Sequence, residues 1–170
     1  MAEVETVRVL QVHQDLVHQR REWIFERIGW LLMGLLILGG LAGLSGPGPL
    51  SHATTGDPGS SVWAEYNRFE RKQAPAILKV HVATGVASGD TVRLWIDRKF
   101  IEKIEIRHMD PEPRAVLAGT DRMTFVIGVT DAGSETLVTC HFEPNEHGPL
   151  PARLGLEGAR ELRFSQFIYP

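Results

Sequence analysis

The stretch that decides the fold runs from Ile28 to Leu44 and reads IGWLLMGLLILGGLAGL, without a charge or a strongly polar side chain. As a helix, these residues cover roughly 25 Å at about 1.5 Å per residue, which is near the lower limit for crossing a bilayer. Trp23 and Trp30 occupy positions typical of an interfacial aromatic belt. A buried helix in a soluble core is disfavoured because the run has no polar face. We therefore predict a transmembrane helix over residues 28–45.

The flanks of this run favour a retained signal anchor over a cleaved signal peptide. The preceding segment, residues 1–27, is long for the charged region of a signal peptide, and the following Ser-Gly-Pro-Gly is a mediocre cleavage site. Close to the apolar run, arginines occur only on its N-terminal side. The next Lys or Arg after the run is Arg68. We therefore predict a single-pass protein of the cell membrane, which is the inner membrane of a cell that has two. The positive-inside rule predicts its orientation. Its N-terminus is expected in the cytoplasm, and residues 46–170 in the periplasm or another extracytoplasmic space.

Residues 1–27 show the pattern of a cytoplasmic amphipathic helix that continues into the membrane helix. Val9, Leu16, Trp23 and Trp30 recur every seven residues, and a second apolar column lies beside them. Such a stripe needs cover from the membrane surface or from another protein. We expect these four residues to make helix contacts with a partner.

Gly39 and Gly43 have the spacing that allows two membrane helices to approach closely. We predict that they are packing points for another membrane-protein subunit. The alternative is that glycine is simply common in membrane helices.

Two further regions follow the membrane helix. Residues 46–61 are rich in Gly, Pro and Ser without apolar periodicity and are predicted to be a linker. From residue 62 onward apolar residues alternate with polar ones, which is typical of strands. Seven to nine short strands in residues 62–170 predict an antiparallel β-sandwich of immunoglobulin-like architecture. The fold class is thus mainly β with one transmembrane α-helix. The clearest rows are Leu78–Val82, Val92–Ile96, Met123–Val129, Val138–Phe142 and Leu162–Ile168, with shorter candidates at Trp63–Phe69, Phe100–Ile106 and Ala152–Leu156.

The sequence carries no recognisable catalytic pattern. It lacks a Gly-x-Ser-x-Gly elbow, a phosphate-binding glycine loop, a His-Glu-x-x-His helix and paired cysteines. A net charge of −3 disfavours a nucleic-acid partner. Cys140, His141 and His147 resemble copper ligands in type, but Cys140 is in phase with the core residues and His141 is not. We therefore predict a protein that is not an enzyme and that uses no metal and no cofactor.

These features favour a noncatalytic single-pass accessory or structural subunit of a larger membrane complex, such as a respiratory or photosynthetic one. Its partners would be other membrane-protein subunits and the lipid bilayer. The alternative is a membrane-tethered periplasmic domain that binds a ligand or protein of the cell envelope. At the C-terminus, Phe167 and Tyr169 alternate with the inward residues of the last strand, so they are predicted outer contacts of the β domain.

Overall fold

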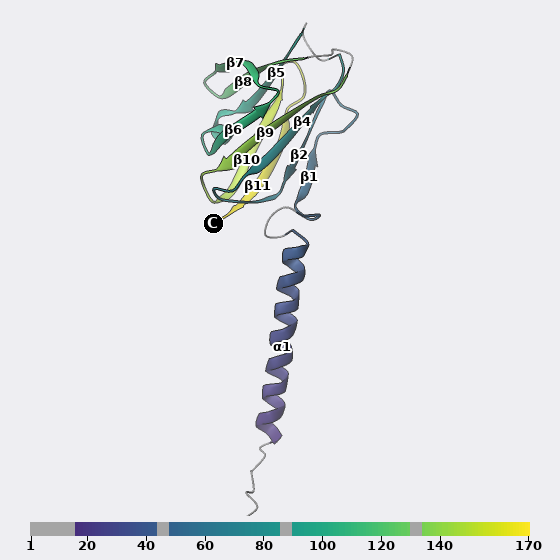
Figure 1. Cartoon of the computed structure of the whole chain (residues 1–170), viewed down its shortest axis with the longest axis vertical. Helices are drawn as coiled ribbons and strands as arrows, with labels where there is room; N and C mark the ends of the chain where they lie inside the picture. Colours follow the sequence, from purple (N-terminus) through teal and green to yellow (C-terminus); the bar gives the residue numbers. More distant parts are fainter. Residues whose placement is uncertain (1–15, 44–47, 86–89, 130–133) are drawn as a thin grey trace, which may run out of the picture. The chain divides into compact units, whose positions relative to one another are not determined.

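The computed structural model describes residues 16–43, 48–85, 90–129 and 134–170, with side chains described from residue 20 onward. The chain divides after Leu38 into two compact units, which are considered separately below. The first unit contributes most of one long helix, α1, and the second is a β-sandwich (Figure 1). An N-terminal apolar helix followed by a two-sheet β-sandwich is the fold class that the sequence predicts.

Helix α1 spans Leu16–Leu41 without interruption. Its residues 20–41 have a mean hydropathy of 1.7, and their length and composition suffice to cross a membrane. None of this apolar stretch is buried within the chain. An apolar helix left uncovered by its own chain needs lipid or another protein around it.

The end of α1 corrects the predicted glycine contact. The helix stops at Leu41, short of the predicted residue 45, and Gly43 follows it with a φ of +93°, a conformation that favours glycine. A Cβ added to Gly43 would lie 2.6 Å from Cα of Gly48, so the two glycine backbones are in close contact. Gly39 and Gly43 therefore do not share one helical face, and only Gly39 lies within the helix.

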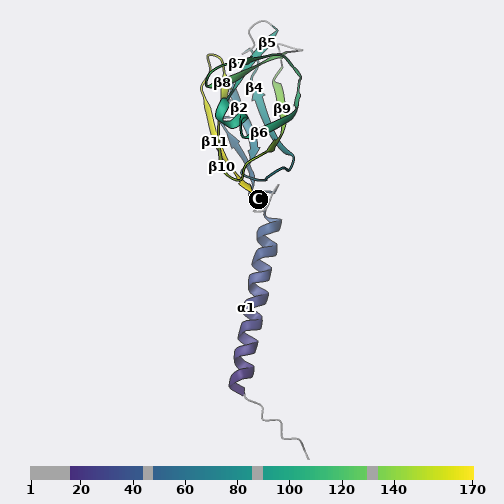
Figure 2. The same ribbon diagram turned by 90° about the vertical axis from the view of Figure 1, so that its left-hand side faces the viewer.

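The second unit contains two facing sheets, each built from strands distant in sequence. In Figure 2 β10 and β11 lie on one side of the sandwich and β9 on the other. The five-stranded sheet has the order β1 (His52–Thr55), β2 (Val62–Asn67), β4 (Ala76–Val82), β9 (Thr136–Pro144) and β6 (Ile104–Asp110). The six-stranded sheet has the order β3 (Phe69–Arg71), β11 (Leu162–Tyr169), β10 (Gly148–Leu156), β5 (Thr91–Asp97), β8 (Arg122–Gly128) and β7 (Pro113–Ala118).

The core lies between the sheets and consists of the inward residues of each alternating row. Leu78 and Val80 of β4 are each 1% exposed, and Phe142 of β9 is equally buried. Phe100 contacts Phe142 and Phe164 edge to face, with ring centroids 5.7 and 6.0 Å apart. Burial of this apolar surface is the main stabilising contribution, and it fixes which residues are left on the two outer faces.

Four details depart from the predicted β domain. Strand β1 lies inside the predicted linker, residues 46–61, and pairs with β2 although only Ala53 of its residues is buried. Strand β3 pairs with β11 in parallel, so the sandwich is not purely antiparallel. Strand β7 was not predicted, and the short helix α2 (Arg98–Ile101) replaces the start of the predicted strand Phe100–Ile106. Asp97 caps α2, because its carboxylate accepts a hydrogen bond from the Lys99 N–H.

Candidate functional site

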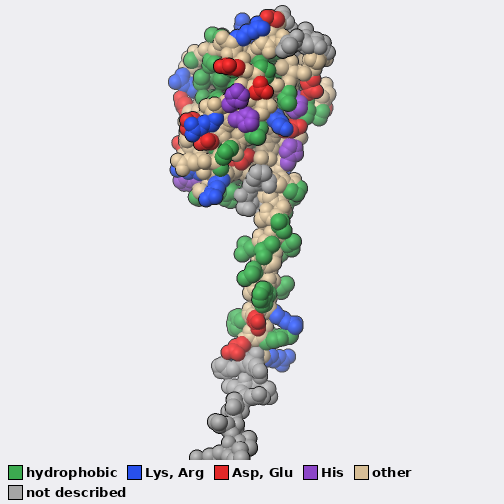
Figure 3. All heavy atoms as spheres, in the orientation of Figure 1, with side chains coloured by type: hydrophobic (Ala, Val, Ile, Leu, Met, Phe, Trp, Pro, Cys, Tyr) green, Lys and Arg blue, Asp and Glu red, His purple; other side chains and the backbone are tan. Residues whose placement is uncertain are grey.

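The outer face of the five-stranded sheet carries a mixture of aromatic, apolar and imidazole side chains. We call it the histidine face and define it by Trp63, Ile77, His81, His108, Leu137 and His141. Alternation along β2, β4, β9 and the end of β6 turns these residues outward while their neighbours fill the core. Figure 3 shows histidine side chains gathered on this side of the sandwich, with charged groups around them.

Two rows of side chains cross the histidine face. In the first, Trp63 of β2 lies opposite His81 of β4, which in turn lies opposite Leu137 of β9. In the second, Ile77 of β4 lies opposite His141 of β9. Ile77 is 40% exposed and Leu137 is 43% exposed. Large apolar side chains are thus presented to solvent from a rigid sheet, with charged residues such as Lys79 between them.

His81 is held in one position by contacts on three sides. Its ring stacks on Trp63 with centroids 3.7 Å apart and planes at 11°. Its Nδ1 lies 2.8 Å from a carboxylate oxygen of Glu135, and its Nε2 lies 3.5 Å from Glu65. The Trp63–His81 pair is therefore a preorganised flat surface, and little side-chain entropy would be lost on covering it.

A bulge in β6 places a second pair of imidazoles side by side. The register of β6 against β9 shifts between Ile106 and His108, so that His108 lies opposite His141. The two ring centroids are 6.1 Å apart. Arg107, the inserted residue, bridges Glu105 and Glu143. The hydrogen bond from Arg107 is the main cause of a lowered pKa for Glu143.

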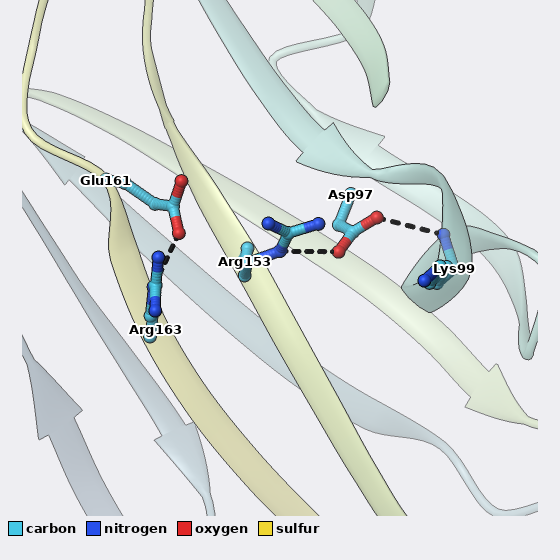
Figure 4. Close-up of polar contacts among 5 residues, drawn as sticks. All are labelled: Asp97, Lys99, Arg153, Glu161 and Arg163. Atoms are coloured by element: carbon cyan, nitrogen blue, oxygen red, sulfur yellow. Dashed lines mark hydrogen bonds and ion pairs between the residues drawn. The ribbon is translucent and has the colours of Figure 1, made fainter. Parts of the chain in front are cut away.

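The six-stranded sheet presents a different outer face, built from arginines and acids. Figure 4 shows Arg163, Arg153 and Asp97 on three neighbouring strands. Arg153 donates from Nε to Asp97 at 2.8 Å, and Arg163 donates in the same way to Glu161. Burial alone would raise the pKa of Asp97, but the hydrogen bonds from Arg153 and from the Lys99 N–H outweigh it and lower that pKa.

A hollow of about 430 Å³ lies beside this ion pair. Trp95 forms part of its wall, and its indole lies across Gly155, where an added Cβ would come within 3.0 Å of the ring. The guanidinium carbon of Arg122 lies 5.6 Å from the centre of the Trp95 ring. Of the carboxylates that line the hollow, Asp97 serves the ion pair with Arg153 and the cap of α2, and Glu161 pairs with Arg163.

Cys140 is a buried residue of the core. Its side chain is 2% exposed, and burial raises the pKa of the thiol to about 12. It points into the core while His141, the next residue, points outward, as the alternation predicts. Within the described residues, no three or more His, Cys, Asp or Glu side chains are grouped so that they could hold a metal ion.

The structure describes only some of the residues that were predicted to make helix contacts with a partner. Val9 lies outside the described residues, and Leu16 is the first residue of α1, with its side chain not described. Trp23 is 52% exposed and carries the guanidinium of Arg27 over its ring at 3.5 Å, and Trp30 is 66% exposed. Their role as partner contacts stays a prediction.

The predicted outer contacts of the β domain lie on β11, at the edge where β3 joins it. Phe167 is 43% exposed, and its ring centroid lies 5.2 Å from that of Tyr169. Tyr169 lies a further 6.0 Å from Phe69 of β3. The two residues thus form one small aromatic cluster, and its contact with a partner stays a prediction. The histidine face was not predicted, because its composition depends on strand order and register.

Comparison with known proteins gives a structural likeness alone. No protein-family model matches the chain, and no curated protein matches it. Among solved structures, the chain is similar to the cohesin module of a family 33 glycoside hydrolase from Clostridium perfringens ATCC13124. The match covers 69% of this chain and 98% of that one, at 11% sequence identity and a TM-score of 0.39.

Proposed function

We propose that the chain is a noncatalytic, membrane-tethered binding module, in which α1 anchors a β-sandwich that recognises another protein of the cell envelope. The observation that carries this proposal is the histidine face. It combines exposed Ile77 and Leu137 with the stacked Trp63–His81 pair on a rigid sheet. Exposed aromatic and apolar residues beside charged ones are found at protein interfaces, where aromatic residues are enriched.

Helix α1 supports the tether. Its apolar stretch is long enough to cross a membrane, and its large apolar side chains are exposed within the chain. Arg20, Arg21 and Arg27 lie at its N-terminal end, while no Lys or Arg occurs from residue 28 to residue 67. This asymmetry favours an N-terminus in the cytoplasm and a sandwich on the other side of the membrane.

A binding role also agrees with the chemistry of the described residues. The buried thiol of Cys140 is held in its protonated form at neutral pH, and the best-aligned carboxylates are paired with arginines. These arrangements stabilise the fold, and they do not place the Cys140 thiol, Glu143 or Asp97 for acid–base or nucleophilic chemistry. The outer surface of the sandwich is the part that offers contacts to a partner.

Site-specific photo-crosslinking in intact cells tests this proposal. A photoreactive amino acid at Leu137 or Ile77 should give one discrete adduct, because a partner would cover both positions. The same amino acid at Arg93, on the outer face of the six-stranded sheet, is the matched control. A second substitution, Trp63→Asp, should abolish the adduct at Leu137 by placing a charge in the interface.

Two results would contradict the histidine face as the binding surface. One is an adduct at Arg93 as strong as that at Leu137. The other is an adduct at Phe167 with none at Leu137 or Ile77, which would assign binding to the aromatic cluster on β11 instead.

An accessory subunit of a membrane complex is the second candidate. It is favoured by Trp23 and Trp30, which are exposed on α1, and by Gly39, which lies within the helix. The case for an accessory subunit is weaker because Gly43, one of the two predicted packing glycines, lies beyond the end of α1. A specific intramembrane partner would require the sequence of α1, whereas a tether requires only its length and hydropathy. This difference gives the two candidates opposite outcomes when the helix is exchanged.

A further inference from the structure

The His108–His141 pair has a geometry that the tethering and partner-binding roles do not require. Both side chains leave the same face of adjacent strands, at positions directly opposite each other. Opposite residues on neighbouring strands have side chains close enough to touch or to share a ligand. The next residues, Met109 and Cys140, are also opposite each other and both are buried, which confirms that the two histidines point outward together.

The bulge at Arg107 is what creates this pairing. Ile106 lies opposite Phe142, so an uninterrupted register would place Arg107, and not His108, opposite His141. The inserted residue advances β6 by one position and brings the two imidazoles together. Bulges are frequent next to functional sites because they redirect a side chain in this way.

The spacing of the two rings fits a shared metal ion. A metal–imidazole bond of about 2.0–2.1 Å places the ion roughly 3.2 Å from the ring centre. Two rings on one ion are then about 4.5–6.4 Å apart, depending on the angle at the metal. The observed 6.1 Å lies within this range, so the spacing of the two rings is compatible with a shared ion.

The charges around the pair also suit a cation. Arg107, which precedes His108 on β6, is bound to Glu105 and Glu143, which neutralise it. Asp110 follows His108 by two residues on β6, and is therefore on the same face of the strand. Imidazole ligands favour the later first-row divalent ions, and among these Cu²⁺ binds nitrogen donors most tightly.

We propose that His108 and His141 form a surface site for a late first-row divalent cation, with Cu²⁺ bound most tightly. Two imidazole nitrogens coordinate the ion, and water fills its remaining positions. The site is a two-ligand site, so its affinity is lower than that of a closed structural site. Both ligands come from one sandwich, so the site needs no residue of the proposed partner, although it lies on the same histidine face.

The test is a Cu²⁺ titration of the full chain in detergent, purified without a polyhistidine tag and followed by electron paramagnetic resonance. The wild-type protein should show one site with nitrogen coordination. His108→Gln and His141→Gln should each weaken Cu²⁺ binding by at least about tenfold, because even second-shell changes at metal sites cost that much. Cu²⁺ should also raise the Tm of the wild-type protein and not that of either variant.

Two further variants serve as controls. His147→Gln alters an exposed histidine in the β9–β10 turn, and a double variant with His13→Gln and His18→Gln removes the N-terminal imidazoles. Both should bind Cu²⁺ like the wild type. Wild-type affinity in His108→Gln or in His141→Gln, with unchanged Tm in the absence of metal, would overturn the site. A Cu²⁺ spectrum without nitrogen coordination would overturn it as well. Neither result would affect the crosslinking outcome at Leu137.

Discussion

At the scale of single residues, buried ionisable groups show how the environment sets their chemistry. Glu70 of β3 is 3% exposed, and burial raises the pKa of its carboxyl above the ordinary value of 4.5. The hydrogen bond from Nδ2 of Asn67 opposes this shift without cancelling it. A carboxyl with a raised pKa stabilises the fold below the pKa of the unfolded chain, and this contribution is lost as pH rises through the folded value.

Replacement of Glu70 should therefore stabilise the protein at neutral pH. Glu70→Gln keeps the acceptor for Asn67 and removes the buried charge, so we expect a gain of about 1 kcal/mol, or roughly 4 °C in Tm, at pH 7. The gain should shrink towards zero at pH 4, where the wild-type carboxyl is protonated. Thermal melts at the two pH values measure it. An equal gain at both values would show that the charge is not its cause.

Cys140 gives a second prediction at this scale. With its thiol buried and its pKa raised to about 12, the folded protein should not react with thiol reagents at pH 8. The same protein in denaturant should react stoichiometrically. Colorimetric thiol titration measures both states, and rapid labelling of the folded protein would contradict the assigned position of Cys140 in the core.

At the scale of elements, the ion pair between Asp97 and Arg153 joins β5, β10 and α2. Asp97 caps α2 and accepts from Arg153, with its side chain 9% exposed. Asp97→Asn keeps an acceptor for the cap of α2 but removes the charge, and it should cost about 1–3 kcal/mol through the lost charge-assisted hydrogen bond from Arg153. Urea denaturation at pH 7 measures this loss.

The stability lost in Asp97→Asn should depend on pH in one direction. Because the folded pKa of Asp97 is lowered, its stabilisation is present above the ordinary value of 3.8 and is lost as pH falls through the folded value. The difference in the free energy of unfolding between Asp97→Asn and the wild type should thus be constant from pH 8 to pH 5 and should become smaller at lower pH. Asp90→Asn, which breaks the exposed pair with Arg114, should have little effect at any pH. An equal loss from both variants would contradict the role of burial.

Some strands of the sandwich could be predicted from the sequence, and others could not. Alternation identified the longer strands, because one buried face imposes a strict period of two. It missed β1 and β7, whose residues are mostly exposed and so carry no such period. It placed Cys140 inward and Phe167 outward correctly. It did not find the histidine face, because the pairing of His108 with His141 depends on a bulge that leaves no mark in the sequence.

At the scale of the whole molecule, the proposed function gives the helix and the sandwich separate tasks. Thiol labelling can test on which side of the membrane the sandwich lies. An Asp57→Cys variant places a thiol on an exposed turn of the sandwich, and a membrane-impermeant maleimide should label it in intact cells. The wild-type protein should stay unlabelled because Cys140 is buried. Labelling of Asp57→Cys only after the cells are broken would place the sandwich in the cytoplasm.

The central claim is that α1 serves as a tether while the histidine face binds the partner. It is tested most directly by replacing residues 20–41 with an unrelated apolar helix of equal length and repeating the photo-crosslinking at Leu137. The account predicts the same adduct, in the same yield, with the protein still in the membrane. Loss of the adduct from a protein that remains folded and membrane-bound would contradict it, and would show that the helix itself recognises the partner.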